Sequence, residues 1–147
     1  MVRLRLVAFL AGALLGTVRA ASAQDSVAVI VLAALDVHPD ANAVRRVFLA
    51  RQRFWRAGLV ARPVNQRAQS PLREAFSLAV LGGRVQDFAE YWNDRYFHGT
   101  SPPPTLASDE AVVRYVTRTP GAIGYVTLDA ARAAGDGVRI VLVFALP

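Results

Sequence analysis

The residues best suited to binding chemistry gather around a predicted helix start in the middle of the chain. Ser70-Pro71 favours a helix beginning, because a hydroxyl side chain can cap the first turn and proline is preferred at its first position. The unpaired backbone N–H groups of that turn and the helix dipole attract anions, and an arginine can hold a tetrahedral oxyanion through two donors. The candidate anion-binding residues are Ser70, Leu72, Arg73, Arg62, Asn65 and Arg67.

A simpler interpretation of this helix start is equally compatible with the sequence. Ser70 then only caps the helix and Arg73 only covers surface, since Ser-Pro helix starts are common without a ligand. The charge pattern favours an anion, because residues 41–73 hold eight arginines and no acidic residue. Arginines on the solvated face of one helix nevertheless explain part of that run without any ligand.

No set of residues in the chain has the pattern of a catalytic or metal site. The chain has no cysteine, which excludes disulfide staples, zinc-finger frameworks and thiol nucleophiles. Its two histidines, His38 and His98, lie far apart and lack the spacing of metal ligands. Neither a G-x-S-x-G motif nor a P-loop occurs. We therefore expect a protein that is not an enzyme and that uses no metal or cofactor.

The first 23 residues have the pattern of a secretory signal. Arg3 and Arg5 precede an apolar run over Leu6–Val18, and the small residues of 21–23 offer a cleavage motif. Cleavage after Ala23 leaves one domain over residues 24–147. The Arg-only, Ala-rich usage is typical of a GC-rich bacterial genome, so the expected compartment is the periplasm.

The net charge looks at first like that of a nucleic-acid-binding protein. All 17 basic residues are arginines, and with 11 acidic residues they give a net charge of +6 over 147 residues. Removal of residues 1–23 takes away three arginines and leaves a net charge of +3. The aromatic residues follow the spacing of a hydrophobic core rather than of an exposed stacking surface. We therefore expect no nucleic-acid partner.

Four strands are predicted along the chain. The first is a nearly unbroken apolar run that suits a strand covered on both faces, and Pro63 confines the second to a sheet edge because proline cannot donate to a ladder. Two further apolar runs lie near the C-terminal end. The predicted strands span Val27–Leu35, Leu59–Val64, Ala122–Thr127 and Val138–Phe144.

Helices are predicted after three capping residues, Asp40, Ser70 and Ser108, and in two segments without a clear cap. Two of these helices carry apolar stripes at helical spacing. The stripes are Leu72, Ala75, Phe76, Ala79 and Val80 in one helix, and Val85, Phe88, Ala89, Trp92 and Tyr96 in the next. Strands that alternate with helices predict a mainly parallel sheet with helices packed on it.

Three segments resemble the motifs of one protein family. Phe48–Ala50 with Phe54–Gly58 is similar to the "iFlG…W.dG" signature of phosphate ABC transporter substrate-binding proteins. Ser70–Phe76 resembles that family's "SGTR..F" helix start, and Pro120–Val126 resembles its "pGAIGYV" segment. The three segments occur in the family's order and span about residues 44–126, which is most of the expected mature chain.

The resemblance implies an α/β fold, a single three-layer lobe like that of a periplasmic binding protein, with a mainly parallel sheet flanked by helices. It also implies recognition of inorganic phosphate or a similar oxyanion, together with an envelope transporter or receptor subunit. Family members close two lobes around the anion, whereas this chain has the length of one lobe. A homodimer or a partner subunit would then supply the second wall of the site.

The chain departs from the family at the anion-binding loop. It has Ser70-Pro71-Leu72 where the family has Ser-Gly-Thr, so the threonine hydroxyl is absent and Pro71 has no N–H to donate. The alternative function is therefore a one-lobe scaffold that mediates protein interaction in the cell envelope. Its interface would be the surface that a second lobe otherwise covers.

Overall fold

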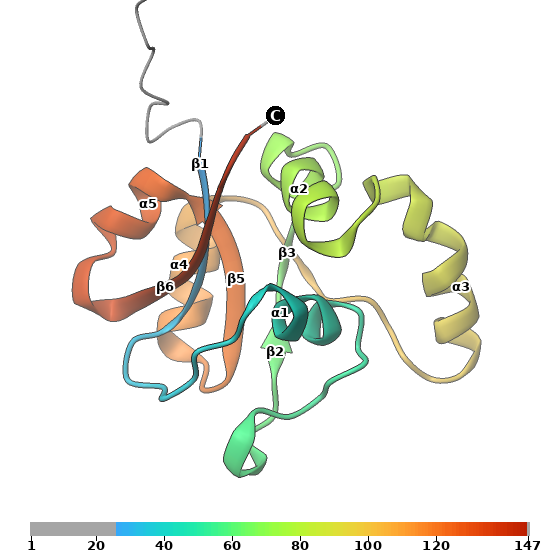
Figure 1. The fold of residues 1–147 in the computed structure, drawn as a ribbon, viewed down its shortest axis with the longest axis horizontal. Coiled ribbons are helices and arrows are strands. Elements are labelled where there is room, and N and C mark those ends of the chain that lie inside the picture. The colour runs from blue at the N-terminus through green and yellow to red at the C-terminus, as the bar shows by residue number, and fades with distance from the viewer. Residues whose placement is uncertain (1–25, 147) are drawn as a thin grey trace, which may run out of the picture.

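A four-stranded sheet forms the centre of the molecule (Figure 1). The computed structural model describes residues 26–146, so the predicted signal segment and its cleavage site after Ala23 lie outside the described residues. The strand order is β2-β5-β1-β6. These strands are β1 (Ser26–Leu32), β2 (Arg62–Pro63), β5 (Ala122–Thr127) and β6 (Val138–Ala145). No helix within the described residues is long and apolar enough to cross a membrane.

Strand β1 lies inside the sheet and runs opposite to both its neighbours. Val29 pairs with Tyr125 of β5 and with Leu142 of β6, both in antiparallel register. β2 pairs in parallel with β5, so β2, β5 and β6 share one direction. The expected mainly parallel sheet is therefore wrong, because two of the three pairings are antiparallel. The alternation of strands and helices indicated the common direction of three strands, but not that β1 is inserted between β5 and β6.

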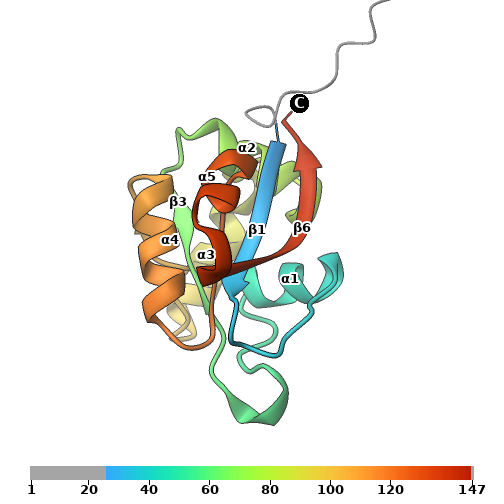
Figure 2. The same cartoon turned by 90° about the vertical axis from the view of Figure 1, so that its left-hand side faces the viewer.

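Helices cover both faces of the sheet, which confirms the expected three-layer α/β arrangement. Helices α1 (Ala41–Phe48) and α2 (Pro71–Phe76) pack on one face. Helices α4 (Asp109–Arg118) and α5 (Leu128–Ala133) pack on the other (Figure 1). Covered in this way, β1 buries five consecutive residues, Val27–Val31. Figure 2 shows β1 beside β6, which forms one free edge of the sheet.

The predicted strand over Leu59–Val64 is shorter in the structure, and the chain changes sheet directly after it. Its β2 part lies at the edge of the main sheet, as Pro63 predicted. The chain then passes into β3 (Asn65–Gln66), which pairs in parallel with β4 (Thr105–Leu106). This change of sheet decides which side chains can meet at the helix start that follows.

Short helical segments complete the described chain. Helix α2 continues directly into a π-helical turn over Ser77–Leu81, and a 3-10 turn over Val85–Phe88 leads into α3 (Ala89–Phe97). Two more 3-10 turns span Arg56–Gly58 and Gly135–Gly137. The predicted caps of α1 and α4 are confirmed: Asp40 accepts from the Ala43 N–H at 2.7 Å, and Ser108 from the Ala111 N–H at 3.2 Å.

Helix α3 carries the second predicted apolar stripe, but this stripe does not join the core. None of its residues is buried, and the side chains of Tyr96 and Phe97 are 66% and 78% exposed. In Figure 1 the helix lies at the side of the molecule, away from the sheet. Polar contacts attach it to the turn after α1, because the Tyr91 hydroxyl donates to the Leu49 carbonyl and the Arg95 guanidinium lies within 3.4 Å of the same oxygen.

Candidate functional site

Buried apolar side chains hold the start of α2 against the core. The apolar stripe predicted for this helix is buried at Leu72, Ala75, Phe76 and Val80, whereas Ala79 is exposed. The ring of Phe76 stacks on that of Tyr125 with their centroids 4.2 Å apart. These contacts fix the helix against β5 and leave its first turn beyond the end of β3.

Ser70 precedes α2 but does not cap it with its side chain, which corrects the expected hydroxyl cap. The Ser70 carbonyl accepts the backbone N–H groups of Arg73 and Glu74, at 3.0 and 3.2 Å. Its hydroxyl instead donates to Gln66 Oε1 over a long 3.4 Å. Among the described residues the Leu72 N–H has no acceptor, because the preceding turn offers none. The turn therefore keeps one weakly engaged hydroxyl and one free amide.

Beneath this turn lies a buried polar network that the sequence did not reveal. The Gln66 N–H donates to the Tyr125 hydroxyl at 3.1 Å, and Gln66 Nε2 donates to Asp109 Oδ1 at 2.6 Å. The Tyr125 hydroxyl donates to Asn65 Oδ1 at 3.2 Å, and burial raises the pKa of Tyr125 to about 12. Asn65 is only 7% exposed, so this predicted site residue supports the turn from inside.

Arg73 is held at the edge of the same network. Its Nη1 donates to the Gln66 carbonyl at 2.8 Å, which orients the guanidinium beside the turn. Arg73 and Asn65 also line a narrow cavity of about 30 Å³. That volume is about a tenth of the smallest ordinary ligand pockets, so the cavity does not enclose a phosphate ion. Arg73 can therefore bind an anion only on the side of its guanidinium that faces away from this cavity.

The carboxylate of Asp109 sets the local electrostatics below the site. It sits in the first turn of α4, and its Oδ2 accepts both the N–H and the hydroxyl of Thr127, at 3.0 and 2.6 Å. Its other oxygen accepts from Gln66. These bonds satisfy the negative charge, but it remains one side chain away from Ser70 and opposes an anion bound there.

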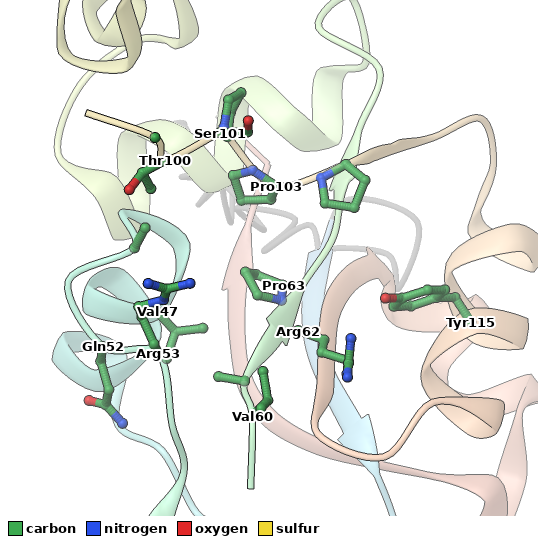
Figure 3. Close-up of a pocket in the computed structure, with 15 residues that line it drawn as sticks. Val47, Gln52, Arg53, Val60, Arg62, Pro63, Thr100, Ser101, Pro103 and Tyr115 are labelled. Carbon is green, nitrogen blue, oxygen red and sulfur yellow. The ribbon is translucent and has the colours of Figure 1, made fainter. Parts of the chain in front are cut away.

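The six predicted site residues do not form one cluster. Ser70, Leu72 and Arg73 share the turn at the start of α2, and the exposed Arg67 precedes it in the same loop. Arg62 lies elsewhere, in a groove of about 350 Å³ (Figure 3). The expectation that it joins the turn assumed one strand leading to the loop, whereas β2 and β3 belong to different sheets. Within the described residues no group of acidic or histidine side chains could hold a metal ion.

Gln66 is the residue of this region that the sequence analysis missed. It is 5% exposed and contacts the nearby Ser70 together with two segments that are distant in the sequence, around residues 109 and 125. A polar residue in a polar loop gives no local sign of burial.

Comparison with known proteins was informative only at the level of structure. No family model and no curated protein matches the chain. A structure assigned as a phosphate ABC transporter substrate-binding protein from Clostridium perfringens, with bound phosphate, matches with a TM-score of 0.63 and 16% identity. The chain shares the fold of the matched part of that protein. The expected resemblance is thus confirmed in fold, by an alignment covering 80% of this chain and 44% of that one.

Two more receptors match in the same way. An ABC-type phosphate transport receptor from Vibrio cholerae gives a TM-score of 0.62 at 16% identity, over 80% of this chain and 45% of that chain. PstS from Borrelia burgdorferi gives 0.61 at 14% identity, over 80% and 46%. The chain therefore spans less than half the length of the receptors that it matches.

Proposed function

We propose that this protein is a non-enzymatic, exported solute-binding-like protein that recognises phosphate or a related oxyanion, in connection with ABC-type transport. The observation that carries the proposal is the shared fold with phosphate receptors, one of which was solved with phosphate bound. Export to the periplasm rests on the signal pattern of residues 1–23.

The start of α2 is the proposed binding position. An anion there would accept from the Leu72 N–H and from the Ser70 hydroxyl, because within residues 26–146 the N–H has no acceptor and the hydroxyl makes one long bond. Arg73 stands beside the turn, and the exposed Arg67 adds a second cation in the loop. The chain supplies one wall of the site, and the anion stays in contact with water on the other side. We therefore expect affinity in the millimolar range unless a second copy or a transporter subunit closes the site.

Titration of the isotope-labelled protein with phosphate and with sulfate tests this proposal by NMR. We expect saturable shifts centred on the amides of Leu72 and Arg73, and a loss of affinity of about tenfold in Arg73→Gln. The matched control is Arg118→Gln, which removes an exposed arginine from the far end of α4. Equal affinity in both variants, or no saturable shift at millimolar anion, would reject the site.

A second candidate function is a one-lobe scaffold for protein interaction in the envelope. It is favoured by α3, which exposes Tyr96 and Phe97 although both are large apolar side chains. If α3 binds a partner, the double variant Tyr96→Ser with Phe97→Ser keeps its thermal stability but loses crosslinks from α3 to envelope proteins. Unchanged crosslinking in that variant would remove this candidate.

A further inference from the structure

A second basic site lies at the groove that contains Arg62. Its walls are the turn after α1, strand β2 with the residues before it, and the proline segment over residues 99–104, with Tyr115 of α4 at one side (Figure 3). The groove is open to solvent and measures about 350 Å³, near the lower end of the range for binding pockets. In Figure 1, β3 leads the chain away from β2 to the start of α2, so this groove is separate from the proposed oxyanion position.

The charged residues that line the groove are all basic. Arg53 and Arg62 are both exposed, and no acidic residue is among the residues that line it. Neither guanidinium has an acidic partner within the described residues. An exposed arginine pair without local acids attracts carboxylates, and each planar guanidinium can bind one of them through two hydrogen bonds.

The arrangement of the two arginines favours an extended ligand. Figure 3 shows Arg53 and Arg62 on the two sides of the strand, with Val60 and Pro63 between them. Two guanidinium groups on the two sides of a strand suit two separate carboxylates of one ligand. A segment that crosses the strand reaches both in turn.

The surface between the arginines is apolar. Val60 is 41% exposed, and Phe54, its bridge partner next to the groove, is 55% exposed. Pro102–Pro104 forms a stiff opposite wall, and the hydroxyls of Thr100 and Ser101 lie along it. An apolar side chain of a ligand could therefore pack at the centre, while its polar backbone meets hydroxyl groups at the rim.

We infer that the groove docks an extended acidic segment of another protein. Two carboxylates of that segment, separated by an apolar residue, pair with Arg53 and Arg62, and the apolar residue packs on Val60 and the prolines. This inference is independent of the proposed oxyanion function, because it uses no residue from the start of α2. It assigns Arg62 to a protein-binding surface rather than to the anion site.

Selection from a displayed random peptide library tests the inference, with the double variant Arg53→Gln/Arg62→Gln used for counter-selection. We expect enriched peptides to carry two acidic residues flanking an apolar one. A synthetic peptide of that sequence should lose affinity about tenfold in each single variant, and its glutamine version should not bind. Arg132→Gln is the matched control, since Arg132 is an exposed arginine on α5. Binding should weaken as salt rises.

Three results would overturn the inference. The first is the absence of any enriched acidic peptide, and the second is binding that survives in the double variant. The third is a preference for anionic vesicles of phosphatidylglycerol that depends on the same arginines and displaces the peptide, which would make the surface a membrane site. Val60→Ser supplies a second check, because this exposed side chain can change without loss of the fold. We expect the variant to lower the affinity for the peptide and to leave the affinity for phosphate unchanged. Phosphate titration at α2 should be unaffected in all these variants.

Discussion

Helices α2 and α3 follow each other in the chain and carry similar apolar stripes, yet only the first is buried. The α2 stripe packs against the sheet. The side chain of Phe76 is 0% exposed, and its ring stacks on that of Tyr125 in β5. The α3 stripe ends in Tyr96, which is 66% exposed. Periodicity therefore indicates that a helix has a face to cover, but not that the same chain provides the cover.

The two helices are also held by different forces. Close packing of aromatic rings fixes α2, whereas hydrogen bonds from Tyr91 and Arg95 to the turn after α1 hold α3. Arg51 and Arg95 additionally lie 5.6 and 5.4 Å from the centre of the Tyr91 ring. A helix held by few polar contacts is expected to open more easily than one held by a core.

The largest expected effect contrasts a phenylalanine from each helix. Phe76→Ala should lower the free energy of unfolding by about 3–5 kcal/mol, because it leaves a cavity between Phe48 and Tyr125. Phe97→Ala should change it by less than about 0.5 kcal/mol, because that side chain is 78% exposed. Urea unfolding measures both. Similar losses in the two variants would break the contrast between the helices.

Alkaline pH should act on the network beneath α2. Burial raises the pKa of Tyr125 to about 12 in the folded protein, against about 10 in the unfolded chain. The resulting stabilisation is complete below pH 10 and is lost as the pH rises toward 12, on the order of 2–3 kcal/mol in total. Unfolding by urea between pH 9 and 12 should show this slope in the native protein and a flatter one in Tyr125→Phe. An equal pH dependence of the free energy of unfolding in both proteins would contradict the raised pKa of Tyr125.

Tyr91→Phe probes the attachment of α3. The change removes the hydrogen bond to the Leu49 carbonyl but keeps the ring between the two arginines. We expect a loss of about 1 kcal/mol and faster hydrogen exchange in residues 89–97 than in 71–76. Uniform acceleration over both helices would mean that α3 opens only together with the core.

Ala50→Gly should have a small effect of the opposite sign. Ala50 has φ = 54° in the turn to which α3 is attached, a left-handed conformation that glycine adopts without strain. The resemblance to the phosphate-receptor motif places glycine at this position. Relief of the strain is partly offset by the larger entropy of unfolded glycine, which leaves a stabilisation of up to about 1 kcal/mol in thermal unfolding. A loss of stability would show that the turn is unstrained.

The extent of sequence-based prediction can be seen in particular residues. Val27–Val31 forms an unbroken apolar run and is buried on both faces, as predicted, but an apolar run contains no information on strand direction. The Pro63 edge position and the Asp40 cap were predictable because each depends on one residue and its immediate neighbours. These local rules operate within a few residues of the chain.

The candidate site was only partly predictable for the same reason. Ser70 was recognised at a helix start, but the partner of its hydroxyl is Gln66, whose position is fixed by Asp109 and Tyr125 from distant segments. Arg62 and Arg73 are near in sequence, yet the chain moves from one sheet to another between them. No property of the local pattern marks that change.

The inserted position of β1 has a consequence for the order of folding. Val27 pairs with Phe144, which lies 117 residues later in the chain, and with Thr127 on its other side. The first strand therefore has no partner until the last strands have been made, and a chain of such high contact order folds slowly. The export proposed for this protein would benefit from such a delay, because β1 cannot complete the sheet while the C-terminal residues are still being synthesised.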